Sequence, residues 1–127
     1  MYLIMEHYCG VFNDTTAIAA TDTAEYGDMI CEAMIQSKKS QGRDALFEYK
    51  CVEKDSYPYG KSMYLILEHY CGMCDYTTAI AVTPIEGYGN VICEAMTQYK
   101  NKKSQGALFE YSCVEEEHSY RKPDEYE

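Results

Sequence analysis

The sequence predicts an α+β fold in which two tandem ββαβ repeats with antiparallel sheets form one globular, pseudo-twofold unit. The first reason is that MYLIMEHYCG at residues 1–10 returns as MYLILEHYCG at 63–72. With an offset of 62 and no gaps, about three in five positions over 1–53 are identical. The second reason is that each half shows strand-like alternation before and after one helical stripe. Chains of about 60 residues bury too little surface to be stable alone, so the halves are expected to share a core.

The repeat also sets the domain boundaries. Residues 1–53 form the first repeat and residues 63–115 form the second. Between them, 54–62 (KDSYPYGKS) contains Pro58 and Gly60 and is predicted to be a linker. Residues 116–127 are polar and are predicted to form a C-terminal tail.

The first strand is predicted at residues 2–9, where apolar and β-compatible side chains occupy both faces. A strand that is apolar on both faces belongs in the middle of a sheet. Its odd-numbered residues share one face, and its even-numbered residues share the other, which we expect the helix to leave uncovered. After a turn at 10–14, a second strand is predicted at 15–21, with Ile18 and Ala20 on one face, and the second copy repeats it at 77–83.

An amphipathic helix follows in each half. Its expected start is a capping box from Thr83 to Glu86, with Pro84 at the first helical position. In the first half the start is expected at Thr21 or Asp22. The residues of the core-facing stripes recur at helical spacing; they are Tyr26, Met29, Ile30, Ala33 and Met34, and Tyr88, Val91, Ile92, Ala95 and Met96.

The third strand of each half is predicted at residues 45–52 and 107–114. Phe47, Tyr49 and Cys51 alternate onto one face, with Glu48 on the other. A right-handed crossover places this strand on the far side of the first, which gives the order 2-1-3. Antiparallel pairing is expected to place Cys51 opposite Leu3. The six strands then form either one continuous sheet or two packed sheets.

The composition and charge of the chain exclude some classes of protein and of binding partner. A chain that is 46% hydrophobic and 25% charged is expected to fold. Its formal net charge of -10 argues against direct binding of nucleic acid or an anionic membrane, and fits either a basic partner or high solubility. No apolar run approaches the roughly 20 residues that span a bilayer. Seven cysteines, an odd number, without a predicted signal peptide indicate reduced thiols in the cytoplasm.

Histidine and cysteine recur as His7-x-Cys9 and His69-x-Cys71, which raises zinc binding and cysteine catalysis as hypotheses. The predicted register leaves Cys9 and Cys51 roughly 20 Å apart, too far for one zinc ion. A catalytic thiolate needs a lowered pKa and partial exposure, whereas these cysteines lie within apolar patterns. We therefore predict no metal, no cofactor, no catalytic residues and no enzyme activity.

Tyrosine is over-represented, with 14 tyrosines against 3 phenylalanines and no tryptophan. Tyrosine is enriched on surfaces that are wet in the free protein and buried in a complex. The alternative is that the tyrosines pack the two halves, or two copies of the chain, against each other. The predicted binding residues are Tyr2, Glu6, His7, Tyr8, Tyr64, Glu68, His69 and Tyr70.

The predicted function is that of a small acidic binding or inhibitor protein that occupies the surface of a partner protein. A basic, nucleic-acid-binding partner is the sharper form, by analogy with viral counter-defence proteins. The alternative is a module that binds or sequesters a nucleotide-type ligand at the junction of the repeats, lined by Tyr8, Tyr70, His7 and His69. The sequence fits a monomer and a homodimer equally.

Overall fold

The structure is a computed structural model, which describes residues 1–55 and 62–117. The chain order is ββαβ followed by ββαβ, as expected of tandem repeats. Neither helix in the described ranges has the length and apolar character that crossing a membrane requires. The elements are β1 (Tyr2–Cys9), β2 (Asn13–Thr21), α1 (Ala24–Ser40), β3 (Phe47–Glu53), β4 (Ser62–Tyr70), β5 (Tyr76–Thr83), α2 (Tyr88–Lys102) and β6 (Phe109–Glu117).

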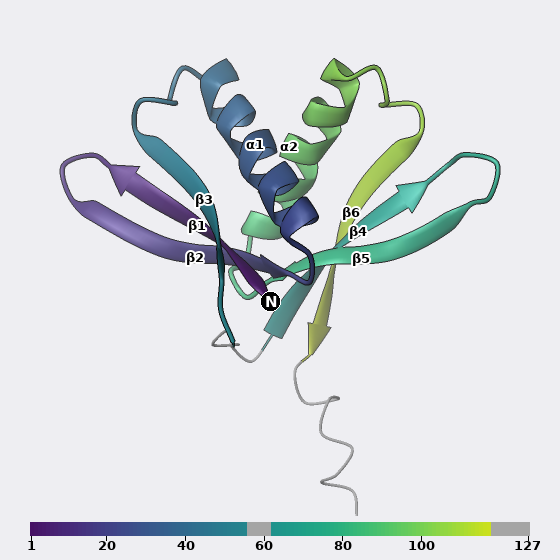
Figure 1. Ribbon diagram of the computed structural model, residues 1–127, viewed down its shortest axis with the longest axis horizontal. Coiled ribbons are helices and arrows are strands. Elements are labelled where there is room, and N and C mark those ends of the chain that lie inside the picture. Colours follow the sequence, from purple (N-terminus) through teal and green to yellow (C-terminus); the bar gives the residue numbers. More distant parts are fainter. Residues whose placement is uncertain (56–61, 118–127) are drawn as a thin grey trace, which may run out of the picture.

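All six strands form one antiparallel sheet in the order β3-β1-β2-β5-β4-β6. The predicted order 2-1-3, with the opening strand central, is confirmed in each half. The halves join where Ala20 of β2 pairs with Val82 of β5. Both helices lie on the same side of the sheet and pack against each other (Figure 1). The sheet is therefore continuous, and the linker predicted at 54–62 falls mainly outside the described residues.

The predicted register between the first and third strands is wrong by one residue. Cys51 pairs with Ile4 instead of Leu3. The reason is that Leu46 still belongs to the turn, because its N–H donates to Arg43 O, and β3 begins only at Phe47. Since paired residues share a face, the shift moves Cys51 to the side of Ile4 and places other β3 residues beside His7.

A β-bulge also divides the second strand. The register of β1 and β2 shifts between Ile4 and Met5. Ile18 consequently faces the helices, whereas Ala20 packs with Leu3 on the opposite face. The predicted common face of Ile18 and Ala20 is therefore wrong, because a bulge interrupts the two-residue period. The second half has the same irregularity at the corresponding place.

The predicted capping box of the second helix is wrong. Thr83 completes β5, and its hydroxyl accepts a hydrogen bond from the Ile85 N–H at 3.2 Å. Residues 84–87 form a turn before the helix, and Gly87 at φ +92° is the N-cap of α2. Glycine suits this position because its lack of a Cβ permits a positive φ.

The first helix begins later than predicted, after Thr23, whose side chain accepts a hydrogen bond from the Tyr26 N–H. The predicted stripe is confirmed in its centre, where Ile30 and Met34 are fully buried. Val91 is the exception in α2, because it is 40% exposed. The helical period therefore locates the buried face better than it locates the helix ends.

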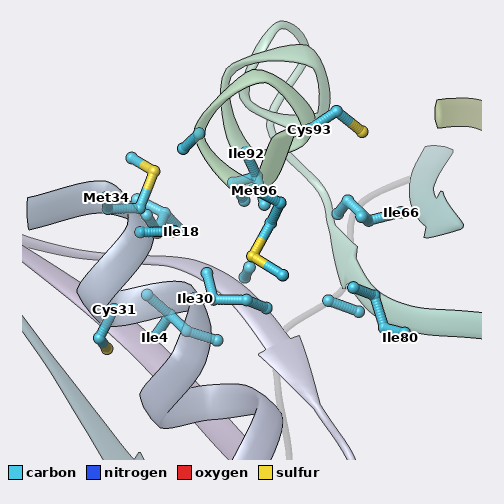
Figure 2. Packing of buried hydrophobic residues seen from close by; sticks show 14 of the residues in the cluster. Ile4, Ile18, Ile30, Cys31, Met34, Ile66, Ile80, Ile92, Cys93 and Met96 are labelled. Carbon is cyan, nitrogen blue, oxygen red and sulfur yellow. The ribbon is translucent and has the colours of Figure 1, made fainter. Parts of the chain in front are cut away.

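One hydrophobic cluster joins the halves beneath the helices. Figure 2 shows side chains from both helices and from strands of both halves meeting in this cluster. A smaller cluster lies on the other side of the sheet, where Leu3 and Ala20 are buried. The main cluster consists of Ile4, Ile18, Ala19, Ile30, Cys31, Ala33, Met34, Tyr49, Ile66, Ile80, Ala81, Ile92, Cys93, Ala95, Met96 and Tyr99.

Candidate functional site

The helices cover the even-numbered face of β1 and β4, so the prediction that this face is uncovered is wrong. Ile4 is fully buried, and Glu6 and Glu68 are only 7% and 4% exposed. The physical reason is that each carboxylate is buried on the side of the sheet that the helices cover, where a tyrosine from the helix of the other half hydrogen-bonds to it. The sequence period shows which residues share a face, but not which face a distant helix covers.

Glu6 accepts hydrogen bonds from two tyrosine hydroxyls, one from each half of the chain. Tyr49 of β3 donates to Oε2 at 2.6 Å. Tyr88 of α2 donates to Oε1 at 2.5 Å. A buried carboxylate is tolerated where strong donors replace its hydration, so this network links the halves and leaves no free carboxylate for a ligand.

Glu68 has the corresponding network. Tyr111 of β6 donates to Oε2 at 2.7 Å, and Tyr26 of α1 donates to Oε1 at 2.5 Å. Burial raises the pKa of all four tyrosine hydroxyls, and the hydrogen bonds to the carboxylates raise it further. The phenols therefore remain protonated donors, and four of the 14 tyrosines stabilise the protein internally.

Tyr8 and Tyr70 lie at the outer ends of β1 and β4. Their rings pack on Phe47 at 5.3 Å and on Phe109 at 5.4 Å between centroids. The outer ends of the two strands lie on opposite sides of the molecule (Figure 1). These tyrosines and the neighbouring His7 and His69 therefore do not line a common pocket at the junction.

Tyr2 and Tyr64 are half-buried at the beginnings of the same strands. They pair with the last residues of β2 and β5, Thr21 and Thr83. Of the eight predicted binding residues, only the two histidines lie on the side of the sheet opposite the helices.

We call that side the open face, and it carries the odd-numbered residues of β1 and β4 with their cross-strand partners. Leu3 and Ala20 are buried there against Met1, Met5, Ala17, Val52 and Val82. No described element covers this face. A cavity of about 160 Å³ lies near the join of the halves and is lined by Met1, Ala20, Thr21, Asp22, Ala79, Ile80, Ala81 and Val82.

A second hollow, of about 550 Å³, adjoins His7 on the open face. His7 Nδ1 lies 2.7 Å from Thr15 Oγ1 and hydrogen-bonds to it. One potential ligand atom from each of His7, Cys9 and Glu48 lies within 4.8 Å of the others. Sequence reasoning missed Glu48, because the register was off by one residue and placed Cys51 on this face. The signal was present in the alternation of 47–51, which puts Glu48 on the face opposite Cys51.

The thiols that lie between the helices and the sheet have raised pKa values, whereas a catalytic cysteine needs a lowered one. Burial raises the pKa of Cys31 and of Cys93 to about 12. Burial likewise raises the pKa of Cys51 and Cys113. An activated cysteine needs a lowered pKa, so these four residues suit packing.

Comparison of the chain with known protein families, with characterised proteins and with solved structures found no match. The open face, the buried networks and the charge distribution are therefore the observations from which a function is inferred.

Proposed function

We propose that this protein is a non-enzymatic binding or inhibitor protein that occupies the surface of a basic partner protein through its open face. The observation that carries the proposal is the apolar cluster around Leu3 and Ala20, over which no described element lies. The proposal keeps the acidic binding protein expected from the sequence, but it moves the contact to the other side of the sheet.

Apolar exposure supports a contact of this kind. Met5, Val52 and Leu67 of the open face are half-buried, and Val114 is 40% exposed. A contiguous apolar patch of this kind marks an interaction surface more often than an isolated exposed residue does. Phe12, at the tip of the β1–β2 hairpin, is 80% exposed and adds a further apolar anchor.

Charge favours a basic partner. Glu48 on β3 and Glu110 on β6 are exposed on the two edge strands, in register with His7 and His69 of the open face. The chain as a whole has a formal net charge of -10. Lys50 of β3 is also exposed on this face, so the local charge is mixed, and it is mainly the net charge of the chain that favours a basic partner. A net negative charge accelerates encounter with a basic surface and selects against acidic partners.

We also infer that the repeats are related by a pseudo-twofold axis that passes between the two helices. Strand registers that correspond at an offset of 62 support this, as do the reciprocal bonds of Tyr88 to Glu6 and Tyr26 to Glu68. An axis there would give the partner two similar contact areas on one rigid sheet, which strengthens binding by linking two modules.

A reducing, cytoplasmic setting belongs to the same proposal. All seven cysteines are free in the structure. The raised pKa of Cys31 and Cys93 supports structural rather than catalytic thiols. Both observations fit a binding protein that works under reducing conditions.

The test is affinity capture from the native host, with the full chain as bait and two matched variants. Ala79→Arg adds one positive charge at an exposed position on the open face, and Asn90→Arg adds the same charge on an exposed helix position. We expect the wild type and Asn90→Arg to retain a basic protein that salt releases, and Ala79→Arg to lose it. Equal capture by both variants, or binding unaffected by salt, would contradict the proposal.

A further inference from the structure

The side chains around His7 form a second kind of site, independent of any protein partner. We propose that His7, Cys9 and Glu48 bind one divalent transition-metal ion of the zinc class on the open face. The residues come from two neighbouring strands. His7 and Cys9 are two positions apart on β1, and Glu48 of β3 pairs with His7. Their potential ligand atoms lie within 4.8 Å of one another.

The distances between the potential ligand atoms are compatible with a metal site. Metal–ligand bonds of about 2.0–2.3 Å in a tetrahedral arrangement place neighbouring ligand atoms roughly 3.3–3.8 Å apart. The ligand atoms lie within 4.8 Å of one another, which exceeds this spacing by at most about 1.5 Å, a difference that rotation of side chains can close without moving a strand. Glu48 is exposed and can rotate freely, whereas His7 and Cys9 are half-buried and already share one face.

The chemistry of the donors selects the ion. An imidazole nitrogen, a thiolate sulfur and a carboxylate oxygen suit Zn²⁺, and Co²⁺ as its spectroscopic substitute, better than Mg²⁺ or Ca²⁺. Three protein ligands leave a fourth position for water from the adjoining hollow of about 550 Å³.

His7 also has a hydrogen-bond partner that can fix the orientation of its ring. His7 Nδ1 lies 2.7 Å from Thr15 Oγ1 on β2. When Nδ1–H donates to that hydroxyl, the lone pair of Nε2 is available to the metal. Hydrogen-bond partners of this kind fix the tautomer and orientation of a metal-binding histidine, and their loss typically lowers metal affinity 10–100-fold.

The second half supplies an internal control. His69, Cys71 and Glu110 occupy corresponding positions, and His69 Nδ1 lies 2.8 Å from Thr77 Oγ1. In the part of the chain that the structure describes, however, only the first half brings three ligand atoms within 4.8 Å. The site is therefore assigned to the first half.

The experiment is titration of the full, tag-free chain with Co²⁺ under a phosphine reductant, followed by competition with Zn²⁺. We expect one equivalent to bind with the near-ultraviolet charge-transfer absorption of a cobalt–thiolate bond, and Zn²⁺ to abolish that absorption. Cys9→Ser should remove the absorption, whereas Cys71→Ser should retain it. Glu48→Gln should weaken binding, and Glu110→Gln should not; both residues are exposed, so these variants test the site without disturbing the core.

Thr15→Val and Thr77→Val complete the design. We expect the first to lower Co²⁺ affinity about 10–100-fold and the second to leave it unchanged. The proposal is overturned if no cobalt–thiolate absorption appears, or if it is lost in Cys71→Ser and kept in Cys9→Ser. Equal weakening by the two glutamate variants would also overturn the assignment to the first half.

Discussion

At the scale of single residues, the two buried glutamates determine how the halves recognise each other. Each accepts one tyrosine hydroxyl from its own half and one from the helix of the other half. Hydrogen bonds to a charged group contribute about 1.5–3 kcal/mol, and losing a donor leaves a buried carboxylate less well solvated. The cross-half bonds of Tyr88 and Tyr26 therefore favour this packing over other arrangements of two similar repeats.

The first prediction concerns Tyr88→Phe, which removes one donor from Glu6 while keeping the ring. We expect the free energy of unfolding to fall by about 1.5–3 kcal/mol, because the carboxylate stays buried with one partner fewer. Tyr26→Phe should have a similar effect through Glu68. The measurement is urea unfolding followed by circular dichroism.

Tyr76→Phe is the control, since Tyr76 is 55% exposed. Its free energy of unfolding should change by less than about 0.5 kcal/mol. If Tyr88→Phe were no more destabilising than this control, the hydrogen bond to Glu6 would not contribute to stability.

The second prediction concerns the buried thiols and pH. The pKa of Cys31 and Cys93 is about 12 in the folded chain, whereas an unfolded cysteine has a pKa of about 8.5. Above about pH 8.5 the unfolded chain loses these protons first, so the free energy of unfolding falls as pH rises. The slope is at most about 1.4 kcal/mol per pH unit for each thiol.

The slope should be measured between about pH 8 and 9, because tyrosines of the unfolded chain, whose pKa is about 10, titrate mainly above that range. Replacing Cys31 and Cys93 by alanine should reduce the slope, whatever the variant loses in absolute stability. A smaller slope should remain, because burial also raises the pKa of Cys51 and Cys113. Cys74→Ala is the control, because Cys74 is exposed. An unchanged slope in the double variant would show that these thiols do not titrate differently in the folded and unfolded chains.

At the scale of elements, two glycines let each helix approach its third strand. A Cβ on Gly27 would lie 2.4 Å from the Sγ of Cys51, and a Cβ on Gly89 would lie 2.1 Å from the Sγ of Cys113. Real Cβ atoms do not come so close to another side chain. The glycines thus cost about 1 kcal/mol of helix propensity each but permit the close packing of helix on sheet.

Local chemistry was sufficient to predict most elements and their order within each half, because alternation, helical period and crossover handedness are all local rules. It was insufficient for the β2 bulge opposite Ile4 and Met5, for the start of α2 and for the register of Cys51. The last two depend on where a turn closes. The burial of Glu6 was the hardest feature to predict from the sequence, since its donor Tyr88 lies 82 residues away along the chain.

The third prediction tests the glycine contacts. Gly27→Ala should lower the free energy of unfolding by about 1–3 kcal/mol, because overpacking outweighs the gain in helix propensity. Adding Cys51→Ala should recover much of that loss, because the next nearest atoms lie 3.5 Å from the new Cβ, at ordinary contact distance. A double-mutant cycle of thermal unfolding measures the coupling. Strictly additive effects would show that helix and strand separate freely at this position.

At the scale of the whole molecule, the two halves share one hydrophobic core. The main cluster contains Ile30 and Met34 from α1 and Ile92 and Met96 from α2. The pairing of β2 with β5 contributes few interactions between the halves. The register pairs only Ala20 with Val82, and the hydroxyl of Thr21 donates to Ile80 O at 2.6 Å. The interface between the halves is therefore made mainly by the helices and the buried glutamates.

The last prediction is that the two halves unfold in one transition. The chain has no tryptophan, so Phe47→Trp reports on the first half and Phe109→Trp on the second. Both phenylalanines are half-buried at the beginning of the third strand of their half, so the substitutions are closely matched. We expect the two fluorescence transitions in urea to coincide with each other and with circular dichroism.

Truncating a core residue in one half sharpens the test. Ile30→Ala removes a fully buried side chain of the first half and should cost about 2–5 kcal/mol. Because Ile30 belongs to the common cluster, the tryptophan at 109 should report the same loss as the tryptophan at 47. If the second half kept its original midpoint, each repeat would hold its own core, and the reciprocal tyrosine–glutamate bonds would join two independently stable units.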